Sequence, residues 1–83
     1  MDKKQFDLRE NLKRDFNDVP LVPRIRKVLD YRYGITDNVP HTLQETGDLY
    51  GVTRERIRQM EAKGLEQYKL WKNAKNEASL TNA

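Results

Sequence analysis

Apolar residues recur along this chain at steps of three and four positions, separated by charged residues, which is the pattern of amphipathic helices. A first helix is predicted from about Gln5 to Asn17. A second should begin at Pro23, which suits a first helical turn, and should end at Gly34 as a left-handed cap. The apolar positions of these two stretches are Phe6, Leu8, Leu12, Phe16, Val19, Ile25, Val28, Leu29 and Tyr33.

Local capping signals predict a third and a fourth helix. Thr42 and Glu45 can form a capping box, in which the Thr hydroxyl accepts from the Glu amide and the Glu carboxylate accepts from the Thr amide. The helix that starts there cannot run past Gly51, and Thr53 offers the next N-cap after a turn of about three residues. One face of the fourth helix should carry Ile57, Met60, Gly64, Tyr68 and Trp71.

The rest of the chain adds no further element. Residues 35–41 have turn chemistry and are predicted to form a loop. After Lys72 there is too little apolar surface to offset the entropy of ordering, so residues 73–83 are predicted to be a disordered polar tail. No stretch alternates with period two over the length of a strand. The predicted fold is all-α: a four-helix domain over residues 1–72 with a C-terminal helix-turn-helix and no winged element.

Composition excludes several classes of function. The 83 residues allow one small domain, and an apolar fraction of 36% predicts a thin core. With no Cys, one His (His41) and one Ser (Ser79), the chain is expected to hold no metal or other cofactor and to be no enzyme. No apolar run approaches the ~20 residues of a membrane span, so a cytoplasmic protein without membrane contact is expected. The net charge of +3 fits a local basic patch without proving one.

The third and fourth predicted helices form a helix-turn-helix candidate, because a short Gly-containing turn joins them and the second is rich in Arg. The missing side chain of Gly47 should let the helices approach closely. Thr46 is the one imperfect contact. The small or apolar residues available where the helices touch are Gly47, Tyr50, Val52, Ile57 and Met60.

The opposite face of the fourth helix carries chemistry suited to reading bases. Arg54, Glu55, Arg58 and Gln59 would point together into a major groove. Arg can donate twice to guanine, Glu can accept from cytosine N4, and Gln can pair with adenine. The alternative is a solvated helix face with local ion pairs, which is what charged runs usually are.

The block from Gly51 to Lys63 resembles the recognition helix of region 4 of bacterial primary sigma factors, and the stretch from Val28 to Ile35 is similar to the helix and turn upstream of it. The resemblance covers about Leu8 to Trp71. It implies a domain that recognises the minus-35 element of double-stranded promoter DNA while tethered to RNA polymerase in the bacterial cytoplasm, at the nucleoid.

The resemblance also implies roles for individual residues. Arg54, Glu55, Arg58 and Gln59 match base-reading positions, and Thr53, Arg56 and Lys63 match phosphate contacts. Leu43 and Gln44 match positions whose backbone amides face a phosphate, as suits a helix N-terminus. Apolar residues of this kind are more often plain core, but the resemblance makes five of them candidates to hold the flap-tip helix of the polymerase beta subunit: Leu12, Phe16, Val28, Leu29 and Tyr33.

Some residues depart from the family pattern. Glu66 and Gln67 stand where several basic residues are common, which puts contacts to transcription activators in doubt. Gly64 replaces the usual Ala at a cost of up to ~1 kcal/mol of helix stability, and Ile25 stands where Glu is common.

An alternative function is a protein-interaction module, in which an apolar groove binds the polymerase flap, an anti-sigma factor or another regulator and DNA contact is secondary. The family's promoter-melting region is missing. The chain is therefore expected to be either a fragment of a longer sigma factor or a stand-alone protein.

Overall fold

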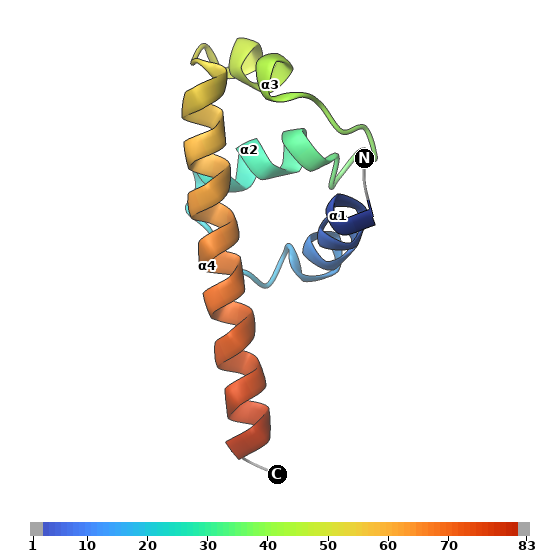
Figure 1. The fold of residues 1–83 in the computed structure, drawn as a ribbon, viewed down its shortest axis with the longest axis vertical. Coiled ribbons are helices and arrows are strands. Elements are labelled where there is room, and N and C mark those ends of the chain that lie inside the picture. Colours follow the sequence, from blue (N-terminus) through green and yellow to red (C-terminus); the bar gives the residue numbers. More distant parts are fainter. Residues whose placement is uncertain (1–2, 82–83) are drawn as a thin grey trace.

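The computed structural model describes residues 3–81, with side chains described for residues 7–75. Its elements are α1 (Lys3–Asp15), α2 (Pro23–Tyr33), α3 (Leu43–Tyr50) and α4 (Arg54–Thr81), with no strand in the described range (Figure 1). The all-α prediction is confirmed. α1 begins and ends two residues earlier than predicted.

The helix ends follow the capping chemistry of the sequence. Pro23 occupies the first turn of α2, and Gly34 ends α2 in the left-handed conformation with φ +61°. A Cβ at residue 34 would also lie 2.5 Å from the backbone carbonyl carbon of Val39, so the loop that returns from α2 requires glycine. The chain therefore reverses tightly after α2 and heads towards α3.

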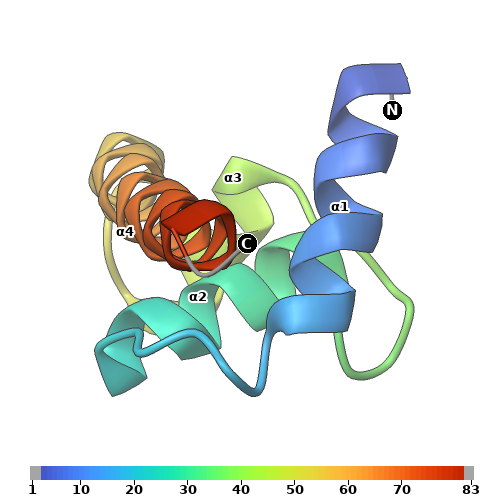
Figure 2. The ribbon, with the colours of Figure 1, turned by 90° about the horizontal axis from the view of Figure 1, so that it is seen from below.

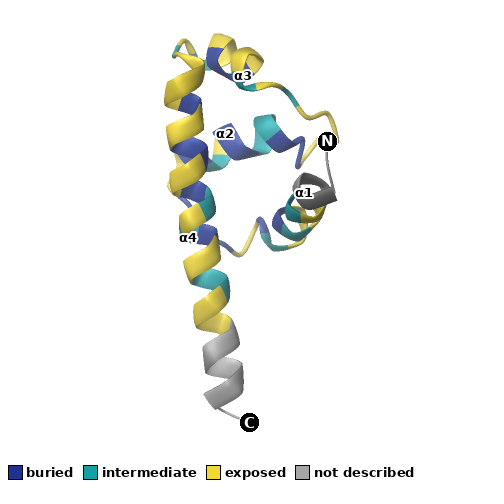
Figure 3. Cartoon of the chain, in the orientation of Figure 1, coloured by how far each residue is buried: buried dark blue, intermediate teal, exposed yellow. Residues whose placement is uncertain are grey.

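α2 crosses between α1 and α4, which lie on opposite sides of the molecule (Figures 1 and 2). The buried faces of the helices meet along this crossing, and the outward faces are exposed (Figure 3). One contiguous apolar core results, as expected for a domain of this size. Its buried members are Leu12, Phe16, Val19, Leu21, Ile25, Val28, Leu29, Tyr33, Ile35, Ile57, Met60 and Tyr68, and Trp71 packs against them half-buried.

Polar contacts attach α1 to its neighbours. Nε of Arg9 donates to the carbonyl oxygen of Tyr33 at 2.7 Å, and Nη2 donates to that of Gly34 at 3.2 Å. At the other end of α1, the Tyr68 hydroxyl of α4 donates to the Asp15 carboxylate at 2.7 Å. The two Arg9 bonds satisfy the last carbonyls of α2. The Tyr68 bond joins α4 to the end of α1.

The five candidates for the polymerase flap contact lie inside the core. Each is at most 7% exposed, so all five are core residues of the free chain, and their contact with the flap stays a prediction. They are buried because α1 and the turn after it supply apolar side chains to the same core as α2. The residues concerned are Leu12, Phe16, Val28, Leu29 and Tyr33.

The predicted end of the fourth helix at Lys72 is wrong, because α4 continues to Thr81. The disordered tail predicted from residue 73 therefore differs from the structure, which has helix over 73–81; residues 82 and 83 lie outside the described range. From Leu65 to Thr81 the chain has no Gly or Pro and is rich in Ala, Lys, Glu and Leu, which are good helix formers. Local helix propensity therefore accounts for the extra turns.

Gly64 lies where α4 packs against α2. A Cβ at residue 64 would lie 2.5 Å from Cγ2 of Ile25 and 2.9 Å from Cδ1 of Leu29. The two departures noted in the sequence therefore form one contact, in which the glycine on α4 leaves room for the isoleucine on α2. Burial of Ile25, which is 6% exposed, offsets the helix propensity lost at Gly64.

Candidate nucleic-acid interface

The turn between α3 and α4 is built as the sequence predicts. Both halves of the capping box form: the Glu45 amide donates to the Thr42 hydroxyl at 3.1 Å, and the Thr42 amide donates to the Glu45 carboxylate at 2.9 Å. Gly51 ends α3 with φ +69°, and the Thr53 hydroxyl accepts from the Arg56 amide at 3.1 Å, which caps α4. The first helix, the turn and the second helix are therefore all fixed by local hydrogen bonds.

Gly47 lets the two helices come together. A Cβ there would lie 2.6 Å from the Val52 carbonyl oxygen, and both the Gly51 and Val52 amides donate to the Gly47 carbonyl. Thr46, the expected imperfect contact, is fully buried and its hydroxyl donates to the Thr42 carbonyl at 2.8 Å. This bond satisfies the buried hydroxyl, so Thr46 fits the interface.

The four candidate base-reading residues are all exposed on the first two turns of α4. Arg58 makes a two-pronged contact with Glu55, through Nε at 2.9 Å and Nη2 at 2.6 Å. The Arg58 guanidinium lowers the pKa of the Glu55 carboxyl, with a smaller contribution from Arg54. This is the local ion pair expected of a merely solvated face. All four side chains are therefore exposed, and one pair of them is joined by an ion pair.

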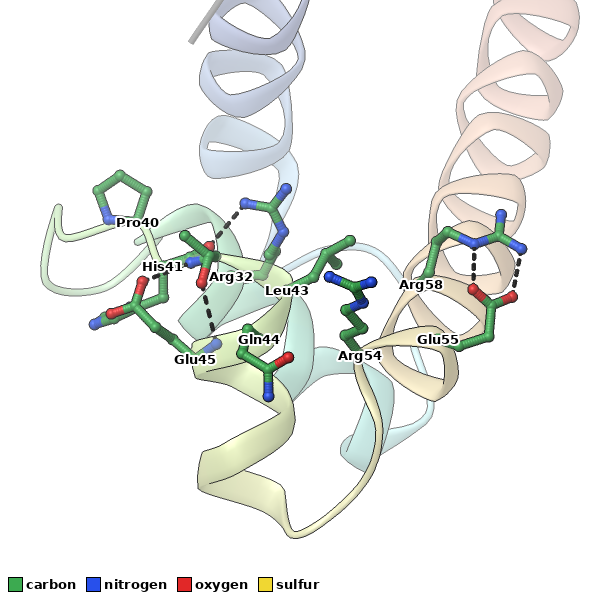
Figure 4. A pocket seen from close by; sticks show the side chains of 10 residues that line it. Arg32, Pro40, His41, Leu43, Gln44, Glu45, Arg54, Glu55 and Arg58 are labelled. Atoms are coloured by element: carbon green, nitrogen blue, oxygen red, sulfur yellow. Dashed lines mark hydrogen bonds and ion pairs between the residues drawn. The ribbon is translucent and has the colours of Figure 1, made fainter.

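An open hollow of about 670 Å³ lies between the starts of α3 and α4. Arg54 stands in the middle of the view in Figure 4, with the Glu55–Arg58 pair on one side and the first turn of α3 on the other. Three of the four candidate base-reading residues line the hollow, and Gln59 lies outside it. The lining residues are Arg32, Pro40, His41, Thr42, Leu43, Gln44, Glu45, Arg54, Glu55 and Arg58.

The first turn of α3 offers backbone donors to this hollow. Because Glu45 and Thr46 use their amides within the cap, the amides of Leu43 and Gln44 are the first-turn donors left without an intrahelical acceptor. Leu43 is half-buried and Gln44 is exposed. The positive end of the α3 dipole therefore faces a space that also contains three Arg side chains, an arrangement suited to anions.

The remaining candidates for phosphate contact, Thr53, Arg56 and Lys63, are exposed but do not line the hollow. On a helical projection Arg56 and Lys63 lie on the opposite flank of α4 from Arg54. Leu43 and Gln44 thus lie beside the hollow, Arg56 and Lys63 lie on the other flank of the candidate base-reading residues, and Thr53 caps α4.

The sequence did not reveal Arg32 as a member of this site. It belongs to α2, and its Nη1 donates to the His41 carbonyl at 2.8 Å, which brings its guanidinium to the wall of the hollow (Figure 4). No local signal distinguishes Arg32 from the other arginines of α2, because only the return of the chain to His41 places it there.

Two other properties are relevant to function. No helix among residues 3–81 is both long and apolar enough to cross a bilayer. Within the same range, no group of three or more His or acidic side chains is placed so that it could hold a metal ion.

The close glycine contact, the capped turn and the exposed Arg-rich second helix define a helix-turn-helix domain. Residues 20–69, more than half of the chain, match the family model described as Sigma-70, region 4. The chain therefore belongs to this family, as the resemblance of the block from Gly51 to Lys63 had indicated.

Its relatives are RNA polymerase sigma factors. The chain is 50% identical over 60 residues to RNA polymerase sigma factor SigA of Nostoc sp., covering 72% of this chain and 15% of that protein. It is 57% identical over 47 residues to RNA polymerase sigma factor RpoD of Neisseria gonorrhoeae, covering 57% of this chain and 7% of that protein. The match to these relatives spans only a small part of their length.

Proposed function

We propose that this chain is the promoter-reading module of a sigma factor and recognises the minus-35 element of double-stranded DNA while tethered to RNA polymerase. The observation that carries the proposal is the exposure of all four candidate base-reading side chains on the first two turns of α4, beside an open hollow. The role is one of binding, without catalysis. It belongs in the bacterial cytoplasm, with polymerase on the nucleoid.

In the proposed complex the start of α4 enters the major groove. Arg54 and Arg58 donate to guanine, Glu55 accepts from cytosine N4, and Gln59 pairs with adenine. Since Glu55 and Arg58 already bond to each other, the bases must compete with this pair. Recognition is then an exchange of partners at an exposed surface.

Phosphates of the duplex lie on both flanks of the proposed reading face. On one flank are the amides of Leu43 and Gln44 and the guanidinium of Arg32, which share the hollow. On the other are Thr53, Arg56 and Lys63. Each phosphate that is neutralised releases counterions, so affinity should fall steeply as salt rises.

The proposal is tested by fluorescence anisotropy on two duplexes that differ only in whether they contain a minus-35-like hexamer. We expect tighter binding to the duplex that contains the hexamer. Arg58→Ala should reduce the ratio of the two affinities by at least about fivefold, because it removes a base contact. Arg56→Ala should weaken binding to both duplexes alike, because a phosphate contact carries no sequence information.

Lys69→Ala serves as the matched control, since Lys69 is an exposed basic residue of α4 about three turns beyond Gln59, the last of the candidate base-reading residues. It should leave the ratio unchanged. Equal affinity of the unaltered chain for the two duplexes in moderate salt would remove the sequence-reading claim.

The contact with the RNA polymerase core is proposed on family membership. Binding of the beta flap through the five predicted apolar side chains would require α1 to move, because all five are buried. A regulator, such as an anti-sigma factor or an activator, remains the alternative partner. A polymerase pull-down that survives the combined change of Arg54, Arg58 and Gln59 to Ala would show that protein contact is independent of DNA reading.

A further inference from the structure

A buried polar network lies directly behind the candidate DNA face. Glu61 stands on α4 three residues after Arg58, and only 9% of its surface is exposed, which is unusual for a carboxylate. Its Oε1 accepts a hydrogen bond from the Tyr33 hydroxyl, and its Oε2 lies 3.7 Å from Nε of Arg32. Burial and the bond to Glu61 both raise the pKa of Tyr33, so the hydroxyl keeps its proton.

Arg32 connects this network to the hollow. Its guanidinium lies over the Tyr33 ring, 5.4 Å from the centroid, and its Nη1 donates to the His41 carbonyl immediately before the cap of α3. Nε of Arg32 is buried and has no hydrogen-bond partner among the described residues. The guanidinium is therefore held against Glu61, Tyr33 and His41 while the side chain, 21% exposed, lines the hollow.

We infer that Glu61 is a positioning residue for DNA binding: it holds the Arg32 guanidinium at the wall of the hollow and does not touch the DNA itself. This inference rests on the proposed function for its ligand, a phosphate of the duplex. The physical reason is preorganisation. A long Arg side chain loses rotamer freedom when it binds a phosphate, and an anchor that has already restricted it lowers that cost.

A simple count of charges predicts the opposite behaviour. Glu61 is a negative charge close to the proposed phosphate site, so its neutralisation should strengthen binding of any duplex if charge alone matters. If Glu61 positions Arg32, the same neutralisation should weaken binding, because Arg32 loses its anchor. The sign of the change therefore separates the two accounts.

The test uses the full chain and a duplex, with anisotropy measured at several salt concentrations. Glu61→Gln, which keeps an acceptor for the Tyr33 hydroxyl, is compared with Arg32→Ala and with the double variant. We expect Glu61→Gln to lower the affinity about threefold or more in the unaltered chain and to have less than a twofold effect in the Arg32→Ala background. Arg32→Ala should reduce the slope of log affinity against log salt by about 0.9, the value for one phosphate.

Glu66→Gln is the matched control, because Glu66 is an exposed carboxylate on the same helix and no hydrogen bond or ion pair joins it to the network. It should leave the affinity unchanged or slightly higher. An increase in affinity for Glu61→Gln, or an equal effect in both Arg32 backgrounds, would overturn the inference.

A second measurement needs no DNA. In the free protein, the Arg32 Nε–H should give a nuclear magnetic resonance signal separate from those of exposed arginines, and Glu61→Gln should move it towards their average. An unchanged signal would refute the anchor whatever the affinities. Equal binding of all duplexes would defeat only the proposed promoter reading, because a phosphate contact is independent of sequence.

Discussion

Replacing Gly47 by Ala tests whether the placement of α4 against α3 depends on the glycine contact between them. The added Cβ would lie 2.6 Å from the Val52 carbonyl oxygen and 3.3 Å from the Arg54 amide nitrogen. Ordinary contact begins at 3.4 Å, so the chain segments must separate by about 0.8 Å, the difference between 3.4 and 2.6 Å. Both neighbours are backbone atoms, and no side-chain rotation relieves the overlap.

Two opposing effects determine how far Gly47→Ala changes the free energy of unfolding. Overpacking of this kind costs about 1–3 kcal/mol, while Ala in place of Gly within a helix contributes up to about 1 kcal/mol. We therefore expect Gly47→Ala to lower the free energy of unfolding by about 1–2 kcal/mol. For a domain of this size the melting temperature should fall by roughly 4–16 °C.

The assay is thermal unfolding followed by circular dichroism, together with anisotropy on the two duplexes at a temperature where the variant is folded. The ratio of affinities should fall as well, because α4 shifts relative to α3. The control is Gly51→Asn: residue 51 is left-handed at φ +69°, has no atom within 4 Å of a built Cβ, and should tolerate Asn at a smaller cost. An unchanged melting temperature and an unchanged ratio for Gly47→Ala would refute the argument.

Two further predictions concern the packing of α4 on α1 and α2. Gly64→Ala should destabilise the unaltered chain, because its Cβ meets Ile25 Cγ2 and Leu29 Cδ1, and should destabilise an Ile25→Ala background less, because only the Leu29 contact remains; thermal unfolding of the four proteins checks the difference. The Tyr68 hydroxyl is the main cause that lowers the pKa of Asp15. The stability that the fold gains from this bond is fully present above the ordinary Asp pKa of about 3.9. It is lost as the pH falls through the lower pKa that Asp15 has in the folded chain. Tyr68→Phe should therefore show a smaller drop in melting temperature between pH 5 and pH 2 than the unaltered chain; an equal drop would contradict the assignment.

The parts of the fold that the sequence predicts well depend on local chemistry. Pro23 and Gly34 bound α2, and the Thr42 and Glu45 pair starts α3, because each acts on amides and carbonyls within a few residues. The close approach at Gly47 follows from the same logic, since the turn after it is only a few residues long. The exposure of the four candidate base-reading residues is also local, because one stripe of α4 is buried and the opposite stripe must face out.

The features that the sequence did not reveal depend on contacts between distant residues. Arg32 reaches the hollow only because the chain returns to His41, and Glu61 is buried only because Tyr33 lies opposite it. Whether Phe16 and its neighbours also meet a partner is likewise not a local property of the sequence. An apolar stripe has the same pattern whether a partner or the chain itself covers it, and here α1 covers it.

The bond between Arg58 and Glu55 has a consequence for how sharply promoters would be distinguished. When a duplex presents an unsuitable base, Arg58 can return to Glu55, so the penalty is the difference between two hydrogen-bonded arrangements and not the full loss of one. A buried, unpaired reader would reject imperfect sites outright. Arg58 is exposed and already bonded to Glu55, so each departure from the optimal hexamer would lower the affinity by a modest step. Promoters with imperfect hexamers would then still be bound, over a wide range of strengths.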